Sequence, residues 1–248
     1  MRLNELGNYI ESLLDVSRFR DYCPNGIQIE GRAEVRKIAT GVTASQRFLD
    51  AATAWGADAA LVHHGYFWRG EDAPLTGIKK CRIAHLLRND VSLLAYHLPL
   101  DAHPQLGNNA QLAARLGFIE QGRFGDQNIA CFGELAEART LDRLAYHIGT
   151  VLKRTPLVIG ADDRVIRRIA WCSGGAQDYH EQAVLLGVDA FLTGEVSERN
   201  THIAEETGVA FIAAGHHATE RYGVQALGDY LVAHCGLEHR FFDLDNPV

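Results

Sequence analysis

The sequence lacks the features that mark membrane proteins and disulfide-rich proteins. No stretch approaches the roughly 18 consecutive apolar residues that a membrane-spanning helix requires. The first six residues carry charge where a secretory signal needs an apolar segment. The five cysteines are scattered, and no two have the C-x-x-C spacing of a zinc knuckle or a redox pair. This usage fits a reducing compartment, so we expect a cytoplasmic protein that does not bind a membrane.

Clustered positive charge is also missing. The chain has 24 Lys and Arg against 31 Asp and Glu, a formal net charge of −7, and no run of basic residues. Tight duplex binding depends on basic groups that neutralise phosphates, so it is not expected, although a local basic pocket for one nucleotide remains compatible with this charge. With 248 residues and 47% apolar composition, the chain is long enough for one large globular domain or two small ones.

Part of the sequence repeats. An apolar strand at 38–42, a helix at 45–55 that stops at Gly56, and a buried strand at 57–62 follow one another. A shift of 131 residues places this segment on a second one in register, with Gly56 on Gly187 and Asp58 on Asp189. Strand-helix-strand units pair their strands in parallel, so we predict a duplicated α/β unit.

The rest of the chain extends this plan. A helix is predicted at 3–16 and a short strand at 27–29, and two further apolar strands run into His97 and His216. Residues 126–165, with a predicted strand, helix and strand, are interpreted as a short insertion between the copies. We expect an α/β fold whose duplicated units form two packed lobes, with mixed, largely parallel sheets and a metal cleft between them. The predicted lobes are residues 1–125 and 126–248, together one compact domain.

Groups that bind metals follow the ends of the predicted strands, where ligands collect in open α/β sheets. They are His63 with His64, His97 with Asp101, Glu195, and His216 with Glu220. Imidazoles and carboxylates suit Zn, Mn, Fe or Ni, and the absence of cysteine among them argues against a closed structural zinc site. Five or more such groups exceed the needs of one tetrahedral ion, so two divalent ions bridged by a carboxylate are the natural arrangement.

Each of these groups also has a structural interpretation. His63 and His64 are consecutive, so either one is structural or the chain turns directly afterwards and both reach the rim. Pro99 disfavours a helix between His97 and Asp101, so Asp101 is expected on a loop. There it could equally fix the turn or cap the helix that begins near residue 108.

The last strand end offers a helical arrangement. A helix that starts at His216 would place Glu220 on the same face and leave His217 pointing elsewhere. Glu195 could be a general base, could orient a metal-binding imidazole, or could stabilise a helix N-terminus. We therefore predict that His97 or Glu195 transfers protons or supports the ligands.

Two further segments are open to interpretation. Tyr66, Trp68 and Arg69 follow the histidine pair, and their rings and guanidinium could bind a substrate by stacking on a purine and meeting its phosphates. A hydrophobic rim or a subunit contact is the plainer interpretation. The segment Cys172-Ser173-Gly174-Gly175 resembles a phosphate-cradling turn but lacks the P-loop lysine, so an ordinary strand-to-helix turn is favoured. No G-x-S-x-G motif supports a serine nucleophile.

Motifs along nearly the whole chain together resemble one family. They are Asn25-Gly26-Ile27-Gln28, Thr40-Gly41-Val42-Thr43, Val62-His63-His64-Gly65, His97-Leu98-Pro99-Leu100-Asp101, Gly107-Asn108-Asn109, Thr193-Gly194-Glu195 and Gly215-His216-His217-Ala218-Thr219-Glu220. The sequence resembles the short form of the Nif-three-like family, whose bacterial members are named GTP cyclohydrolase I type 2 homologues.

The resemblance implies a two-lobed α/β fold with a dinuclear metal site and a ring-shaped homohexamer. The residues that match the metal ligands of the family are His63, His64, Asp101, His216 and Glu220. Some relatives carry a large additional domain between the halves, and this chain has only the segment 126–165 in that place.

Two hypotheses for function follow. The first is a metal-dependent hydrolase that activates water for attack on a nucleotide or a related phosphoester, similar to a type 2 GTP cyclohydrolase. The second is a non-catalytic, metal-loaded ring that binds a nucleic acid, a nucleotide or a protein partner as a scaffold or regulator. Turnover that depends on the metal ligands separates the two.

Overall fold

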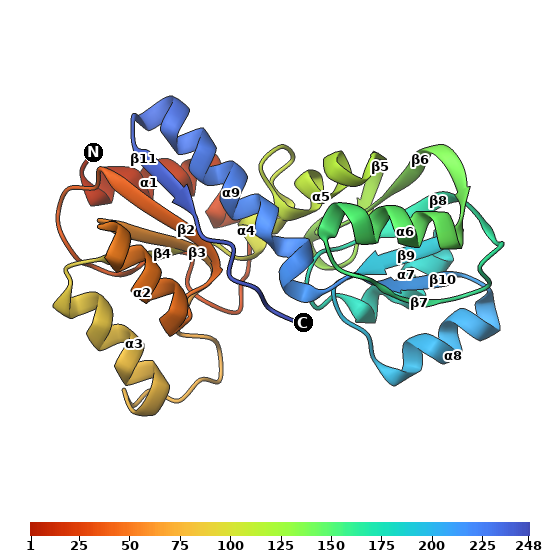
Figure 1. Ribbon diagram of the computed structural model, residues 1–248, viewed down its shortest axis with the longest axis horizontal. Helices are drawn as coiled ribbons and strands as arrows, with labels where there is room; N and C mark the ends of the chain where they lie inside the picture. The colour runs from red at the N-terminus through yellow and green to blue at the C-terminus, as the bar shows by residue number, and fades with distance from the viewer. The chain divides into compact units, whose positions relative to one another are not determined.

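The computed structural model describes residues 1–248 and forms two compact units, each built on one mixed β-sheet (Figure 1). The first unit comprises residues 1–107 and 223–245, and the second comprises residues 108–222 and 246–248. The predicted α/β class and mixed sheets are confirmed. The lobe boundary at 125/126 and a metal cleft between lobes stay predictions.

The first unit contains a five-stranded sheet in the order β1-β4-β3-β2-β11. Its strands are β1 (Gly26–Ile29), β2 (Lys37–Thr43), β3 (Ala59–His64), β4 (Ser92–Ala95) and β11 (Glu238–Phe241). Its helices are α1 (Leu3–Leu13), α2 (Gln46–Trp55), α3 (Gly77–Arg88), the short α4 (Leu98–Ala102) and most of α9 (His216–Cys235). Strand β1 is antiparallel to β4, and the other neighbours run parallel.

Successive side chains along the strands point to opposite faces of this sheet, and both faces are buried. On β3, Ala59 and Leu61 face one core with α1 and α9, whereas Ala60 and Val62 face a second core with α2 and α3. Figure 1 shows these two pairs of helices on opposite faces of the sheet. Because both faces are covered, the central strands are mostly apolar between their ends, and the buried Thr40 in the middle of β2 has its hydroxyl 2.7 Å from His239 Nε2.

The second unit contains a six-stranded sheet in the order β5-β6-β8-β9-β10-β7. Its strands are β5 (Phe118–Phe124), β6 (Ala130–Thr140), β7 (Leu157–Ile159), β8 (Val165–Trp171), β9 (Ala190–Thr193) and β10 (Ala210–Ala213). Its helices are α5 (Asn108–Leu116), α6 (Leu141–Leu152), α7 (His180–Leu185), α8 (Glu198–Thr207) and the first turns of α9. Strands β8, β9 and β10 are parallel, and the other pairs are antiparallel.

The two sheets repeat the same arrangement at their centres. Strands β2, β3 and β4 lie side by side in parallel in the first sheet, and β8, β9 and β10 do so in the second. Asp58 accepts hydrogen bonds from the backbone amides of residues 36 and 37, and Asp189 accepts the equivalent bonds from those of residues 167 and 168. Gly56 and Gly187 end the equivalent helices at φ 80° and 66°. The repeat seen in the sequence therefore corresponds to a repeat of local structure.

The chain forms no disulfide, and no helix combines the length and the apolar composition that a membrane span demands. His180 is an unusual member of the second core, because its ring is fully buried between Phe191 and Phe211. Burial lowers the pKa of His180 to about 4, with a smaller opposing effect from the backbone of Val209. The imidazole is therefore neutral in the folded chain at neutral pH.

His180 should make the chain sensitive to acid. The unfolded chain binds a proton at this imidazole below about pH 6.5, and the folded chain does so only near pH 4. Stability should therefore fall as the pH drops through this window, by about 2 kcal/mol between pH 7 and pH 5. Urea unfolding of the wild type and of His180→Phe should show this extra loss in the wild type alone. His202→Gln, at an exposed histidine of α8, is the matched control, and an equal loss in wild type and His180→Phe would contradict the assignment.

Candidate metal centre

His63 and His64 end strand β3, and their ring centroids lie 4.6 Å apart. His63 is fully buried, and its Nδ1 lies 3.0 Å from the carbonyl oxygen of Tyr96. His64 is half-buried, with its Nδ1 3.2 Å from the Thr43 hydroxyl. Strand β3 continues through His64, so the chain does not turn between the two histidines. Even so, the two rings lie side by side, and neither points away from the other.

His97 follows strand β4 and is held by Asp21. The Nδ1 of His97 lies 2.7 Å from Asp21 Oδ1, and the backbone amide of Leu98 donates to Asp21 Oδ2 at 2.9 Å. The side-chain nitrogen of Asn25 donates to the same carboxylate, and its side-chain oxygen accepts a hydrogen bond from the backbone amide of His97 at 2.7 Å. Burial opposes ionisation of Asp21, but the hydrogen bond and charge of His97 and the bonds from Asn25 and Leu98 outweigh it and hold its pKa at about 2.

Asp101 lies on a helix, and the prediction of a loop was wrong. Helix α4 contains Pro99 in its first turn, where the missing amide hydrogen would have had no partner within the helix. The amides of Leu100 and Asp101 both donate to the carbonyl oxygen of His97, at 2.9 and 3.1 Å. This turn places the buried Asp101 carboxylate 3.5 Å from His63 Nε2. The proline therefore starts the helix that carries the acid.

The first unit thus gathers three imidazoles at the ends of neighbouring strands. His63, His64 and His97 each offer a ring nitrogen within 4.8 Å of the others, close enough to hold a metal ion. Asp101 adds a carboxylate beside His63. Two of the strand ends that the sequence singled out are therefore brought together within this unit.

In the second unit, His216 lies between two carboxylates. It begins α9, and its Nε2 lies 3.0 Å from Glu220 Oε2, as the predicted i, i+4 spacing on a helix requires. Its Nδ1 lies 2.6 Å from Glu195 Oε1, just after strand β9. Although burial opposes protonation, the hydrogen bonds to Glu220 and then Glu195 raise the pKa of His216 to about 9. The two acids thus favour a cation at this place.

The glycine turn at 173–175 is built for close packing. The amide of Gly174 donates to the Thr219 hydroxyl at 3.0 Å, and the amide of Ser173 donates to Asn109 Oδ1 at 2.9 Å. These amides are used within the chain, in agreement with an ordinary strand-to-helix turn. Gly174 has φ +69°, and a Cβ there would collide with Glu220 Oε1.

One pattern is common to these four histidines. Each bonds through Nδ1 to an oxygen of the protein, from Tyr96, Thr43, Asp21 and Glu195 in turn. A carbonyl or carboxylate oxygen only accepts, so a neutral imidazole at His63 or His97 carries its hydrogen on Nδ1 and its lone pair on Nε2. At His216 both nitrogens face carboxylate oxygens, so both carry hydrogens in the absence of metal, and a metal ion would replace the hydrogen on Nε2. Histidines that bind metals are held in this way in proteins. The donor set therefore fits a metal centre.

The predicted substrate-binding residues differ in their positions. Tyr66 is buried, and its hydroxyl donates to the carbonyl oxygen of Ala44 at 2.7 Å, so its position favours packing over stacking on a ligand. Trp68 is half-buried, with its ring centroid 5.0 Å from that of His97. Arg69 is exposed and donates to the Asp21 carbonyl oxygen at 3.1 Å. A substrate role for these residues stays a prediction.

Sequence reasoning missed the residues that orient the histidines. Asp21 lies far from His97 in the chain, and no sequence pattern joins the two residues. The side chain of Gln28 also joins distant loops, because its Oε1 accepts the Tyr66 amide at 2.7 Å. The one available signal was the Asn25-Gly26-Ile27-Gln28 motif of the family resemblance, whose polar side chains make these contacts.

Known proteins resemble this chain over its whole length. A family model described as Duf34/NIF3 (NGG1p interacting factor 3) matches residues 1–247. A Pseudomonas aeruginosa protein named GTP cyclohydrolase 1 type 2 homolog is 56% identical over 99% of this chain and 98% of its own length. A protein of the same name from Escherichia coli K12 is 49% identical over all of both chains.

Solved structures also match this chain over its whole length. Protein ybgI, described as of unknown function, superposes with a TM-score of 0.96 at 48% identity and covers 100% of both chains. TTHA1606 from Thermus thermophilus superposes with a TM-score of 0.89 at 32% identity, again over 100% of both chains.

Asp21 should contribute more to the stability of the fold than a carboxylate in an ordinary surface ion pair does. Asp21→Asn turns one oxygen into a donor that faces other donors, so we expect the free energy of unfolding to fall by about 2 to 3 kcal/mol. Asp50→Asn is the matched control, because Asp50 lies 3.5 Å from His85 Nδ1 with an exposed side chain and should lose less than about 1 kcal/mol. Urea unfolding measures both, and equal losses would contradict the role given to Asp21.

Gly174 should be intolerant of a side chain. Gly174→Ala introduces both the strain of positive φ, about 1 kcal/mol, and a collision with Glu220. Gly187→Ala introduces the same strain at φ +66°, and its nearest neighbouring atom lies 3.9 Å from the added Cβ. Thermal unfolding should therefore show a loss for Gly174→Ala that exceeds that of Gly187→Ala by about 1 to 3 kcal/mol. Equal losses would show that Glu220 moves aside without cost.

Proposed function

This chain belongs to the Duf34/NIF3 family, and we propose that it is a metal-dependent hydrolase with a dinuclear centre. The proposed ligands are His63, His64 and Asp101 from the first unit and His216 and Glu220 from the second. Family membership agrees with the resemblance stated from the sequence motifs. The observation that carries the proposal is the shared orientation of the imidazoles, with Nδ1 bonded to the protein and Nε2 presented as the ligand atom.

Each unit supports the proposal by its own donor set. Two buried carboxylates, Asp101 and Glu220, lie 3.5 and 3.0 Å from the Nε2 atoms of His63 and His216. Burying a carboxylate is costly unless a cation or a hydrogen-bond donor compensates it. The donor set of one unit alone does not supply the ligands that two ions need, whereas the donor sets of both units together do. We therefore propose that both contribute to one centre.

The residues of the chain then have separate tasks. Divalent ions at such a centre polarise a substrate oxygen and lower the pKa of bound water. Asp21 and Glu195 keep their histidines in one tautomer by accepting the Nδ1 hydrogen. His97 adjoins the ligand histidines, with its ring centroid 5.0 Å from that of His63, which suits a role in proton transfer.

For the substrate, we propose a nucleotide or a related phosphoester. The relatives named GTP cyclohydrolase 1 type 2 homolog support a purine nucleotide as the first one to test. The indole of Trp68 lies beside His64 and His97, with ring centroids 6.0 and 5.0 Å apart, where an aromatic base could stack on it. The guanidinium of Arg69 could meet a phosphate.

The test combines metal content with turnover. Wild-type protein loaded with Mn or Zn should retain two ions per chain and hydrolyse at least one member of a panel of GTP, other nucleotides and phosphoesters. His63→Ala and Glu220→Ala should each lose bound metal and reduce the rate at least about 100-fold, since each removes a ligand. His202→Ala, at an exposed histidine that pairs only with Glu198, should match the wild type.

The outcomes separate the two hypotheses for function. Loss of both metal and turnover in the ligand variants, with unchanged assembly and circular dichroism, supports the hydrolase. Metal that is retained by the wild type without turnover on any substrate favours the non-catalytic, metal-loaded ring. A wild-type chain that takes up no metal would overturn both.

A further inference from the structure

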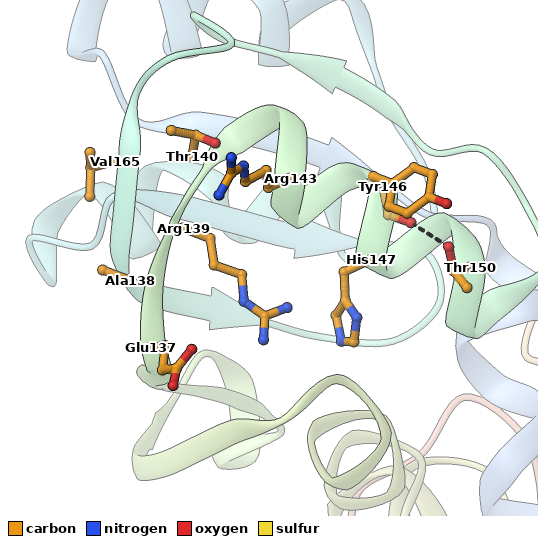
Figure 2. Close-up of a pocket in the computed structure, with 9 residues that line it drawn as sticks. All are labelled: Glu137, Ala138, Arg139, Thr140, Arg143, Tyr146, His147, Thr150 and Val165. Carbon is orange, nitrogen blue, oxygen red and sulfur yellow. Dashed lines mark hydrogen bonds between the residues drawn. The ribbon is translucent and has the colours of Figure 1, made fainter.

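The segment 126–165, predicted as an insertion between the two copies, lies in the second unit and lines a cavity. The cavity, of about 600 Å³, lies between the end of strand β6 and helix α6 (Figure 2). The lining residues are Glu137, Ala138, Arg139, Thr140, Arg143, Tyr146, His147, Thr150 and Val165. This volume is in the range of small-molecule sites. None of these residues belongs to the proposed metal centre.

An irregularity of the sheet forms one wall of the cavity. Glu134 pairs with Arg168 and Arg139 pairs with Ile166, so residues 135–138 of β6 face the single residue Arg167 of β8. This irregularity, with four residues opposite one, carries the strand out of the regular ladder before pairing resumes at Arg139. Bulges of this kind redirect side chains and are common beside functional sites. Here the bulge brings Glu137 and Arg139 to the cavity.

The cavity has an excess of positive charge. Arg139 comes from the strand and Arg143 from the first turn of the helix (Figure 2). The arginine ion pairs of this unit involve Arg123, Arg164 and Arg199, and neither Arg139 nor Arg143 has a carboxylate within ion-pair distance. Glu137 is the one acidic residue in the lining. Both arginines therefore line one cavity, Arg139 on the side of His147 and Arg143 on the side of Thr140 (Figure 2).

His147 adds a directed polar group. Its Nε2 lies 3.2 Å from the carbonyl oxygen of Leu116, which fixes the hydrogen on Nε2 and leaves Nδ1 as an acceptor for a donor group of a ligand, such as a hydroxyl. Tyr146, on the same helix, is 79% exposed and offers an aromatic surface, and Val165 is 59% exposed. Polar and apolar groups thus line one cavity, as a ligand with a charged head and an apolar body requires.

We propose that this cavity binds a phosphomonoester. A phosphate group presents several acceptor oxygens and close to two negative charges at neutral pH, which matches a cavity lined by two guanidiniums better than a single carboxylate does. Phosphate alone would leave most of the cavity empty. The remainder of the ligand therefore extends along helix α6 toward Tyr146.

The experiment is calorimetric titration of the full-length protein with metal removed by EDTA, so that phosphate cannot bind to metal ions. The probes are inorganic phosphate and adenosine 5′-monophosphate at constant ionic strength. We expect saturable binding of both, tighter for the nucleotide. Arg139→Gln/Arg143→Gln should weaken both at least about 10-fold. Lys80→Gln/Arg88→Gln, which removes two charges from exposed residues of α3, should stay within about 2-fold of the wild type.

Tyr146→Ala tests the second part of the ligand. It should weaken the nucleotide several-fold and leave inorganic phosphate unchanged, because only the nucleotide reaches the ring. Absence of saturable binding by the wild type at millimolar probe would overturn the proposal. Equal affinity in wild type and the double arginine variant, with both folded by circular dichroism, would do the same. Because metal is absent throughout, the result does not depend on the proposed hydrolase.

Discussion

The hydrogen bond at Nδ1 of each strand-end histidine is the constraint on which the candidate metal centre depends. An imidazole can present either nitrogen, and only a fixed acceptor on one side decides which is presented on the other. The chain supplies such acceptors from a carbonyl at Tyr96 and carboxylates at Asp21 and Glu195, and at His64 the Nδ1 atom meets the Thr43 hydroxyl, which can accept or donate. The site is therefore determined as much by these oxygens as by the histidines.

Duplication explains where these groups lie. In both units, three parallel strands are covered on their faces, which leaves their carboxyl ends as the places where polar side chains reach a ligand. The aspartates at 58 and 189 fix the opposite ends of the repeated units by binding two backbone amides each. The copies have diverged at their functional ends. The register of the repeat sets His64 of one copy against Glu195 of the other.

The sequence predicts the parts of this structure that follow from local pattern. Helical spacing predicts the pair His216 and Glu220, and strand patterns predict that His63, His64 and His97 lie at the ends of buried strands. Pro99 was misleading, because a proline that would break a helix interior is well placed in a first turn. Asp21 could not be found by pattern, since its partner lies 76 residues away and only the folded chain joins them. The cavity between β6 and α6 depends on a bulge that no periodicity encodes.

The central claim is that the chain binds metal through the Nε2 atoms of histidines anchored at Nδ1. Anomalous diffraction from crystals grown with Mn or Zn, recorded at the absorption edge of the metal, tests it most directly. The account predicts anomalous peaks at coordination distance from Nε2 of His63, His64 and His216, with Asp101 and Glu220 as the carboxylate ligands. Peaks bound through Nδ1, or crystals with no anomalous peak at these residues, would contradict it.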